Sequence, residues 1–264
     1  MIKFTSVEKV RPEYAHWFIY GKMRSGKTRA AATFPRPLFI VPYQEGSHVS
    51  LMGMKGIDFV LVHGSIGEPQ RVAAEPGTAY SLTSILADLE QRYAAAEKLW
   101  QKGTEEANIA ADKLFPWETV VIESISHYTD LVQEELTRGN TLDMDRQKWG
   151  KLSAHLRSTH ARLRSLPVHV VFIALSVEHF DGKGELRGGG PAFPGQMKYK
   201  LPSACECVVY MTHREGKGVG SYKAHFQTHQ VFEAGCRYDE LTKMGSMTPF
   251  SFAKVQKAIG ADNE

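Results

Sequence analysis

The segment that most constrains this chain lies near its N-terminus, between an apolar run and a short helical pattern. It reads Gly21-Lys22-Met23-Arg24-Ser25-Gly26-Lys27-Thr28 and fits GxxxxGK[ST] at every required position. The run Trp17–Tyr20 before it is typical of a buried strand, and the helix after it reaches about Ala32, where Pro35 and Pro37 end it. A strand, a glycine-containing turn and a helix in this order predict an α/β fold.

The residue types in this segment suit a loop that binds phosphate. Gly21 and Gly26 let the backbone turn tightly and direct its N–H groups at phosphate oxygens. The Lys27 ammonium can bridge the β- and γ-phosphates of ATP, and the Thr28 hydroxyl can ligate Mg²⁺. The alternative is a glycine-rich turn without a ligand, which the strand–loop–helix setting disfavours. The predicted nucleotide contacts are Gly21, Lys22, Met23, Arg24, Ser25, Gly26, Lys27, Thr28 and Arg29.

Two acidic residues follow apolar strands and complete the predicted site. Glu123 comes directly after the run Thr119–Ile122, where a carboxylate can hold Mg²⁺ through water. Glu45 follows the strand Leu38–Val41 and is the candidate general base for the attacking water. Either acid could instead face solvent at a strand end or in a loop. The predicted catalytic residues are Lys27, Glu45 and Glu123, and the predicted metal ligands are Thr28 and Glu123.

The rest of the chain alternates short apolar strands with helical patterns, which predicts a mainly parallel sheet flanked by helices. Further strands are expected at Phe59–Val62, Val168–Ala174 and Cys207–Met211, and a long amphipathic helix at 81–100. We expect one domain over residues 1–264. It has a flexible loop at about 181–200, rich in glycine and proline, and a small C-terminal extension after about 243.

Composition narrows the functional classes. No apolar stretch approaches the length of a membrane span, and the N-terminus lacks the apolar run of a signal peptide, so a cytoplasmic protein is expected. The formal net charge of +3 is too mild to indicate nucleic-acid binding by itself. The three cysteines form no disulfide framework, and together with His213 they do not match the spacing of a zinc site. Buried, inert thiols are expected instead.

Taken together, these elements resemble the RecA-type ATPase core. They are most similar to the small phage-encoded, AAA-domain RecA-like proteins linked to single-strand annealing and recombination. The resemblance covers roughly residues 14–243: the phosphate loop, the segment from Phe39 to Glu45, and the strand before Glu123. Two positions depart from the family pattern. Glu123 replaces the expected Asp, and the polar sensor position falls on Leu175 or Ser176.

The resemblance implies partners as well as a fold. It implies single-stranded DNA binding by the loop after the later core strands, and a homo-oligomer or filament in a bacterial host cell. Basic and aromatic residues in such a loop suit sequence-tolerant binding of single strands. Those in the matching segment are Lys183, Arg187, Phe193, Lys198, Tyr199 and Lys200. A neighbouring subunit would supply a cation to ATP, for which Arg214, Lys217 and Arg237 are candidates.

Three functions remain open from the sequence. The first is a DNA-stimulated ATPase that acts on single-stranded DNA. The second is a small-molecule or nucleotide kinase, although the segment 181–200 holds one arginine where a kinase lid carries several. The third is a non-catalytic nucleotide-binding switch or loader, which Glu123 and the missing sensor favour.

Overall fold

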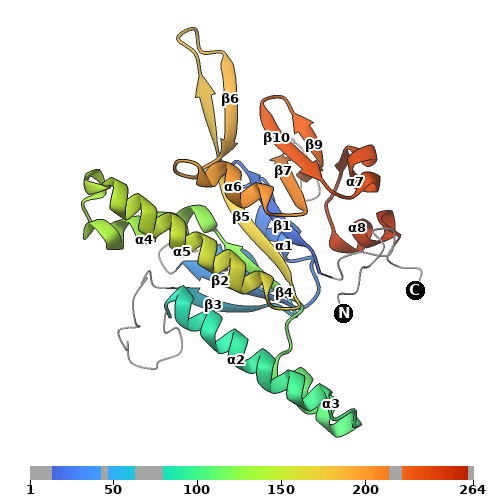
Figure 1. Cartoon of the computed structure of the whole chain (residues 1–264). Helices are drawn as coiled ribbons and strands as arrows, with labels where there is room; N and C mark the ends of the chain where they lie inside the picture. The colour runs from blue at the N-terminus through green and yellow to red at the C-terminus, as the bar shows by residue number, and fades with distance from the viewer. Residues whose placement is uncertain (1–13, 43–46, 63–79, 214–221, 261–264) are drawn as a thin grey trace, which may run out of the picture.

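A computed structural model describes residues 14–42, 47–62, 80–213 and 222–260 of the chain (Figure 1). The strands are β1 His16–Gly21, β2 Pro37–Pro42, β3 Asp58–Val62, β4 Thr119–Glu123, β5 His169–Phe180, β6 Leu186–Pro191, β7 Cys207–His213, β8 Tyr222–His225, β9 Gln227–His229, β10 Phe232–Cys236 and β11 Ser246–Met247. The helices are α1 Lys27–Ala31, α2 Leu82–Trp100, α3 Glu105–Leu114, α4 Ile125–Thr137, α5 Arg146–Arg164, α6 Met197–Ser203, α7 Asp239–Met244 and α8 Phe252–Ala258, with 3-10 turns at η3 Ser47–Leu51 and η4 Thr141–Asp143.

The strands form a sheet in the order β11-β8-β7-β1-β5-β4-β2-β3. From β7 to β3 every neighbouring pair is parallel, whereas β8 and β11 continue the sheet in antiparallel pairing. Because parallel strands need crossover connections, helices cover both faces of this part of the sheet. The predicted α/β fold with a mainly parallel sheet is therefore confirmed.

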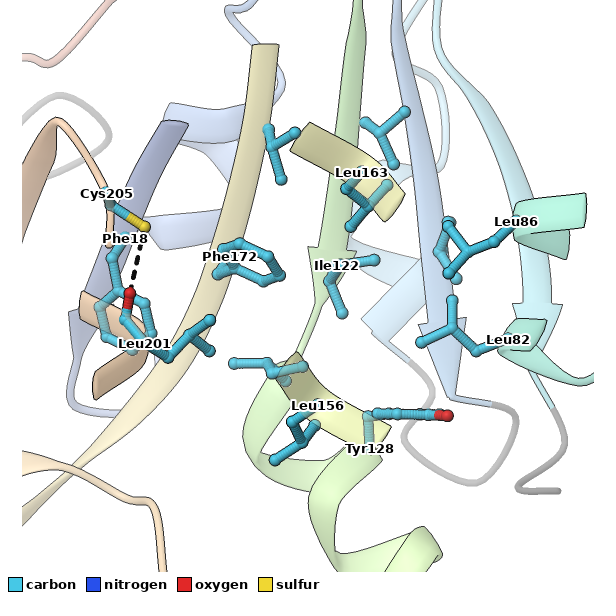
Figure 2. Packing of buried hydrophobic residues seen from close by; sticks show 14 of the residues in the cluster. Phe18, Leu82, Leu86, Ile122, Tyr128, Leu156, Leu163, Phe172, Leu201 and Cys205 are labelled. Atoms are coloured by element: carbon cyan, nitrogen blue, oxygen red, sulfur yellow. Dashed lines mark hydrogen bonds between the residues drawn. The ribbon is translucent and has the colours of Figure 1, made fainter. Parts of the chain in front are cut away.

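Both faces of the sheet are buried, which explains why the strands read as continuous apolar runs. On β1, Phe18 and Tyr20 point to one face and Trp17 and Ile19 to the other, and all four are fully buried. The first face packs against α2, α4, α5 and α6, and the second against α1, α7 and α8. Figure 2 shows the first face, where strand residues such as Phe172 and Ile122 meet Leu156 and Leu163 of α5.

Polar side chains fix the start of the long helices. Ser81, Thr104, Ser124 and Asp145 each accept a hydrogen bond from the backbone N–H three residues later. Such a cap stabilises a helix by about 1 kcal/mol. The Oγ of Ser126, in the first turn of α4, accepts from the Leu175 N–H at 3.1 Å. That bond ties the first turn of α4 to β5.

The predicted loop at 181–200 is wrong in its secondary structure. β5 continues to Phe180, and β6 returns antiparallel to it, so that the two strands form a hairpin that projects from the body (Figure 1). Helix α6 occupies the end of the same interval. A ladder is made by backbone groups, so Gly188–Gly190 can pair with β5 although their composition is typical of a loop. That pairing is not visible in the local composition.

The predicted burial of the cysteine thiols is confirmed for two of the three. Cys205 and Cys207 are buried, Cys236 is half-buried, and all three are free thiols. Burial raises the pKa of the Cys205 thiol, which keeps it protonated. Within the described ranges, no group of three or more histidine, cysteine or acidic residues could hold a metal ion. The same part of the chain contains no helix with the length and hydrophobicity needed to cross a membrane.

Candidate functional site

The loop between β1 and α1 is held in a shape that only glycine allows at two points. Gly26 has a φ of 87°, in the left-handed region, and Arg24 shares that region at 60°. A side chain on Gly26 would also meet the ring of Tyr222 at 2.4 Å. A side chain on Gly21 would meet the Met211 carbonyl oxygen at 2.4 Å. Gly26 is thus required both by its backbone and by its packing, and Gly21 by its packing.

The loop opens onto a cavity of about 420 Å³. This volume falls within the range of small-molecule sites, roughly 300–1,000 Å³. The motif supplies part of the lining, and the rest comes from the ends of β4 and η3, the middle of β5 and the start of α4 and β8. The lining residues are Met23, Arg24, Ser25, Gly26, Lys27, Thr28, Arg29, Ser50, Glu123, Ser124, His127, Leu175 and Tyr222. We name this space the loop cavity.

Lys27 is the buried cation of the loop cavity. Its side chain is 7% exposed, and its Nζ donates to the carbonyl oxygens of Gly21 at 3.1 Å and Lys22 at 2.7 Å. These bonds hold the ammonium inside the turn. Ser25 is buried in the same turn, and its Oγ has no hydrogen-bond partner in the described part of the chain. A buried hydroxyl of this kind calls for a polar partner, which a bound phosphate oxygen would provide.

The acidic side of the loop cavity comes from the end of β4. Glu123 is 4% exposed, and its neighbour Ser124 begins α4. β5 lies between β4 and β1, so the carboxyl ends of these three parallel strands meet at one edge of the sheet. Glu123 therefore reaches the same cavity as Lys27 and Thr28, although about a hundred residues separate them in the sequence. The predicted metal ligands, Thr28 and Glu123, both line this space.

The other predicted residues differ in whether they reach the loop cavity. Lys22 points out of the loop cavity, and its Nζ lies 2.8 Å from a Glu178 carboxylate oxygen on β5. Leu175, at the sensor position, lines the cavity with an apolar side chain. The Ser176 Oγ is buried without a hydrogen-bond partner among the residues that the structure describes. The candidate base Glu45 lies outside the described residues.

Of the three residues predicted to supply a cation to the ATP of a neighbouring subunit, the structure describes one. Arg214 and Lys217 fall outside the described ranges. Arg237 lies after β10, where its guanidinium approaches the Ser203 carbonyl oxygen at 3.3 Å and a Glu206 carboxylate oxygen at 3.8 Å. It does not line the loop cavity.

A comparison with protein families finds a match that covers the residues of the loop cavity. The model of an AAA domain (AAA_24) matches residues 13–238, which include the phosphate loop, β4 and β5. The chain belongs to this AAA-domain family. No curated protein matches it. Among solved structures it is similar to the crystal structure of the RadB recombinase, at 15% identity and a TM-score of 0.37, over 85% of this chain and 84% of that one.

Membership of the AAA-domain family confirms the predicted recognition of a RecA-like P-loop core. A P-loop follows the first strand, and β5 separates that strand from the strand that carries the acid. A phage origin stays a prediction.

Two residues of this AAA-domain site were missed by sequence reasoning. Tyr222, at the start of β8, lines the loop cavity and packs on Gly26. Only the antiparallel pairing of β8 with β7 brings it there, so no local signal could have found it. His127 also lines the cavity, and its Nδ1 lies 2.8 Å from the Ser124 Oγ. Its position three residues after a helix cap could have indicated that it faces the same end of α4.

The predicted DNA-contact residues lie in different parts of the structure and differ in exposure and in partners. Phe193 is 8% exposed and belongs to the core cluster. Arg187, on β6, has its guanidinium 2.8 Å from Asp181 and 2.6 Å from Glu185. Lys198, Tyr199 and Lys200 lie on α6 at the root of the hairpin. The hairpin and the helix therefore offer different chemistry.

Proposed function

We propose that this chain binds ATP and Mg²⁺ in the loop cavity, hydrolyses ATP, and acts on single-stranded DNA in recombination or annealing. One observation carries the nucleotide part of this proposal. Lys27 and Thr28 from the motif and Glu123 from the end of β4 line one cavity of about 420 Å³, bounded by a turn with left-handed backbone. A cation, a hydroxyl and a carboxylate that converge on a phosphate-binding turn suit the triphosphate of ATP and its Mg²⁺.

Each residue has a distinct part in the proposed reaction. The backbone of the turn and the Lys27 ammonium would hold the phosphates, with Lys27 exchanging its carbonyl partners for phosphate oxygens. Thr28 and Glu123 would hold the metal ion, Glu123 through water. Bound Mg²⁺ would neutralise phosphate charge and favour in-line displacement at the γ-phosphorus. The Ser25 Oγ would gain the polar partner that it lacks among the described residues.

Turnover is expected to be slow. Leu175, the last residue of β5 that pairs with β1, lines the loop cavity but cannot hydrogen-bond to a γ-phosphate through its side chain. His127 offers an imidazole to the same cavity from α4 and is the described residue best suited to that contact. Glu45 remains the proposed base that orients water.

Two further functions stay open for the same cavity. The apolar Leu175 favours a nucleotide-binding switch without turnover. A small-molecule kinase is less well supported. Arg187, the arginine of the segment 181–200, is ion-paired on β6 and does not line the loop cavity. The arginines that line it, Arg24 and Arg29, belong to the phosphate loop itself.

The deciding experiment measures ATP binding and turnover with and without single-stranded DNA for the wild type and for Lys27→Ala. Loss of a buried, charge-assisted contact should lower turnover by about 100-fold or more. Lys151→Ala, which removes an exposed lysine on α5, is the matched control and should behave as the wild type.

Each outcome points to one function. ATP binding by Lys27→Ala at wild-type affinity would contradict the nucleotide site. Tight binding without turnover, even with DNA, would favour the switch. Phosphate transfer to a nucleoside monophosphate would favour the kinase. An ATP turnover rate that does not change when single-stranded DNA is added would contradict the proposed action on DNA.

A further inference from the structure

The β5–β6 hairpin is poorly suited to hold DNA at its tip. The turn and the first residues of β6 carry Asp181, Lys183, Glu185 and Arg187, so the acidic and basic charges cancel. Arg187 is also paired with both acids. A phosphate that approached this turn would meet two carboxylates as well as two cations. The tip therefore lacks the local positive charge that binding to a nucleic-acid backbone requires.

A second cavity lies at the root of the hairpin, away from the loop cavity. It measures about 310 Å³ and lies between β6, α6 and β10. Its lining residues are Val177, His179, Gly188, Gly189, Gly190, Pro191, Phe193, Lys198, Tyr199 and Glu233. Figure 1 shows α6 beside the foot of the hairpin, where these elements meet. We name this space the root cavity.

The glycines of β6 show that the root cavity is kept open. Gly189 is needed by the fold, since a side chain there would meet the buried Phe232 ring at 2.4 Å. Gly190 is not, because a side chain would meet no described atom within 4 Å. At Gly188 it would make only ordinary contact, with the His179 ring at 3.7 Å. Neither residue has a positive φ. Glycine inside a strand weakens it and often marks close approach by a ligand.

The chemistry around the root cavity selects a nucleobase attached to phosphate. Val177, Pro191, Phe193 and the bare backbone of β6 form apolar walls. Tyr199 lines the cavity and is 58% exposed, and the Lys198 Nζ lies 4.9 Å from its ring centroid. An aromatic ring can stack on a base while neighbouring lysines neutralise phosphates. Lys200, one residue further along α6, is exposed too. Glu233, the acid in the lining, is exposed at the rim.

We propose that the root cavity takes one unstacked base of single-stranded DNA, with the base against Gly188–Gly190 and Tyr199 and the flanking phosphates at Lys198 and Lys200. This inference rests on the proposed function, because it assigns the place where that function contacts DNA. It moves the contact from the hairpin tip, which sequence composition favoured, to the hairpin root.

The test fills the cavity without removing any charge. In Gly190→Val a β-branched residue replaces glycine in a strand, so folding is not expected to suffer. Gly235→Val is the matched control, since Gly235 lies in strand β10, its added side-chain carbon also meets no described atom within 4 Å, and it does not line the cavity. Fluorescence anisotropy with a labelled oligothymidylate should show affinity reduced by about fivefold or more in Gly190→Val. Gly235→Val and Lys183→Ala, at the tip, should bind as the wild type.

A second arm changes the DNA and tests whether the cavity contacts a base. An oligonucleotide of the same length with abasic sites should bind the wild type more weakly than the intact strand, and Gly190→Val should lose most of that difference. Gly190→Val that binds like Gly235→Val would overturn the root cavity as the base site, as would equal binding of abasic and intact strands by the wild type. Failure of the wild type to bind any single strand would overturn this inference and the DNA part of the proposed function together.

Discussion

The phosphate loop and strand β6 are both rich in glycine, yet their glycines have different causes. In the phosphate loop, Gly26 needs a left-handed backbone and has the Tyr222 ring against it. In β6 the backbone is extended, and only Gly189 is pressed by a neighbour, while Gly190 faces open space. Glycine content alone therefore does not predict a loop. A positive φ, a close neighbour and an empty space are three separate reasons for glycine, and only coordinates tell them apart.

The largest effect should come from the loop side of this comparison. Gly26→Ala must carry a side chain at a φ of 87° and displace Tyr222 near its own Cβ, which cannot swing away. We expect a loss of stability of about 2 kcal/mol and at least about 100-fold weaker ATP binding. Calorimetric titration with ATP and urea unfolding measure the two effects. Gly182→Ala, at an open position in the hairpin turn, is the control, and wild-type ATP affinity in Gly26→Ala would refute the assignment.

A smaller effect should separate the glycines of β6 from one another. Gly189→Ala forces the Phe232 ring to move, and that ring is 1% exposed and stacked on Tyr210 at 4.2 Å. We expect a cost of about 1–3 kcal/mol in unfolding free energy. Gly190→Ala should instead be neutral or stabilise by up to about 1 kcal/mol, because alanine suits a strand better. Equal stability of the two variants in urea unfolding would show that Phe232 does not constrain β6.

The smallest effect concerns the acid sensitivity of folding stability that arises from strand β8. His225 stacks on His229 at 4.0 Å, and its Nε2 lies 3.0 Å from the Thr212 Oγ1. Burial, with a smaller part from His229, lowers the pKa of His225 from 6.5 to about 4. The unfolded chain therefore binds more protons between these values, and stability falls as the pH drops through that window. His225→Asn should lose about 1 kcal/mol less stability than the wild type between about pH 7 and pH 5.

Thermal melts of both proteins at the two pH values measure this difference. His16 and His169 also have a pKa lowered to about 4, each mainly by burial, so the variant keeps part of the acid sensitivity. An identical loss of stability in both proteins would show that His225 titrates normally in the folded state.

The sequence predicted what local patterns encode. Apolar runs located β1, β2, β3, β4, β5 and β7, helical periodicity located α2, and the glycine–lysine motif located the phosphate loop. What it missed depends on pairing between distant segments. Strand β6 needs the far end of β5, and Tyr222 reaches the loop cavity only because β8 folds back on β7.

One long strand joins the two regions compared above. β5 lies beside the P-loop strand, with Leu175 opposite Gly21, and then continues without a break for five residues into the hairpin, about 16 Å at the usual rise per residue. Its root is pinned twice, by the Ser126 Oγ at the Leu175 N–H and by the ion pair between Glu178 and Lys22. The two regions therefore share one strand. We expect a tilt of β5 beside the phosphate loop to displace the hairpin with it, because the hairpin is the continuation of that strand.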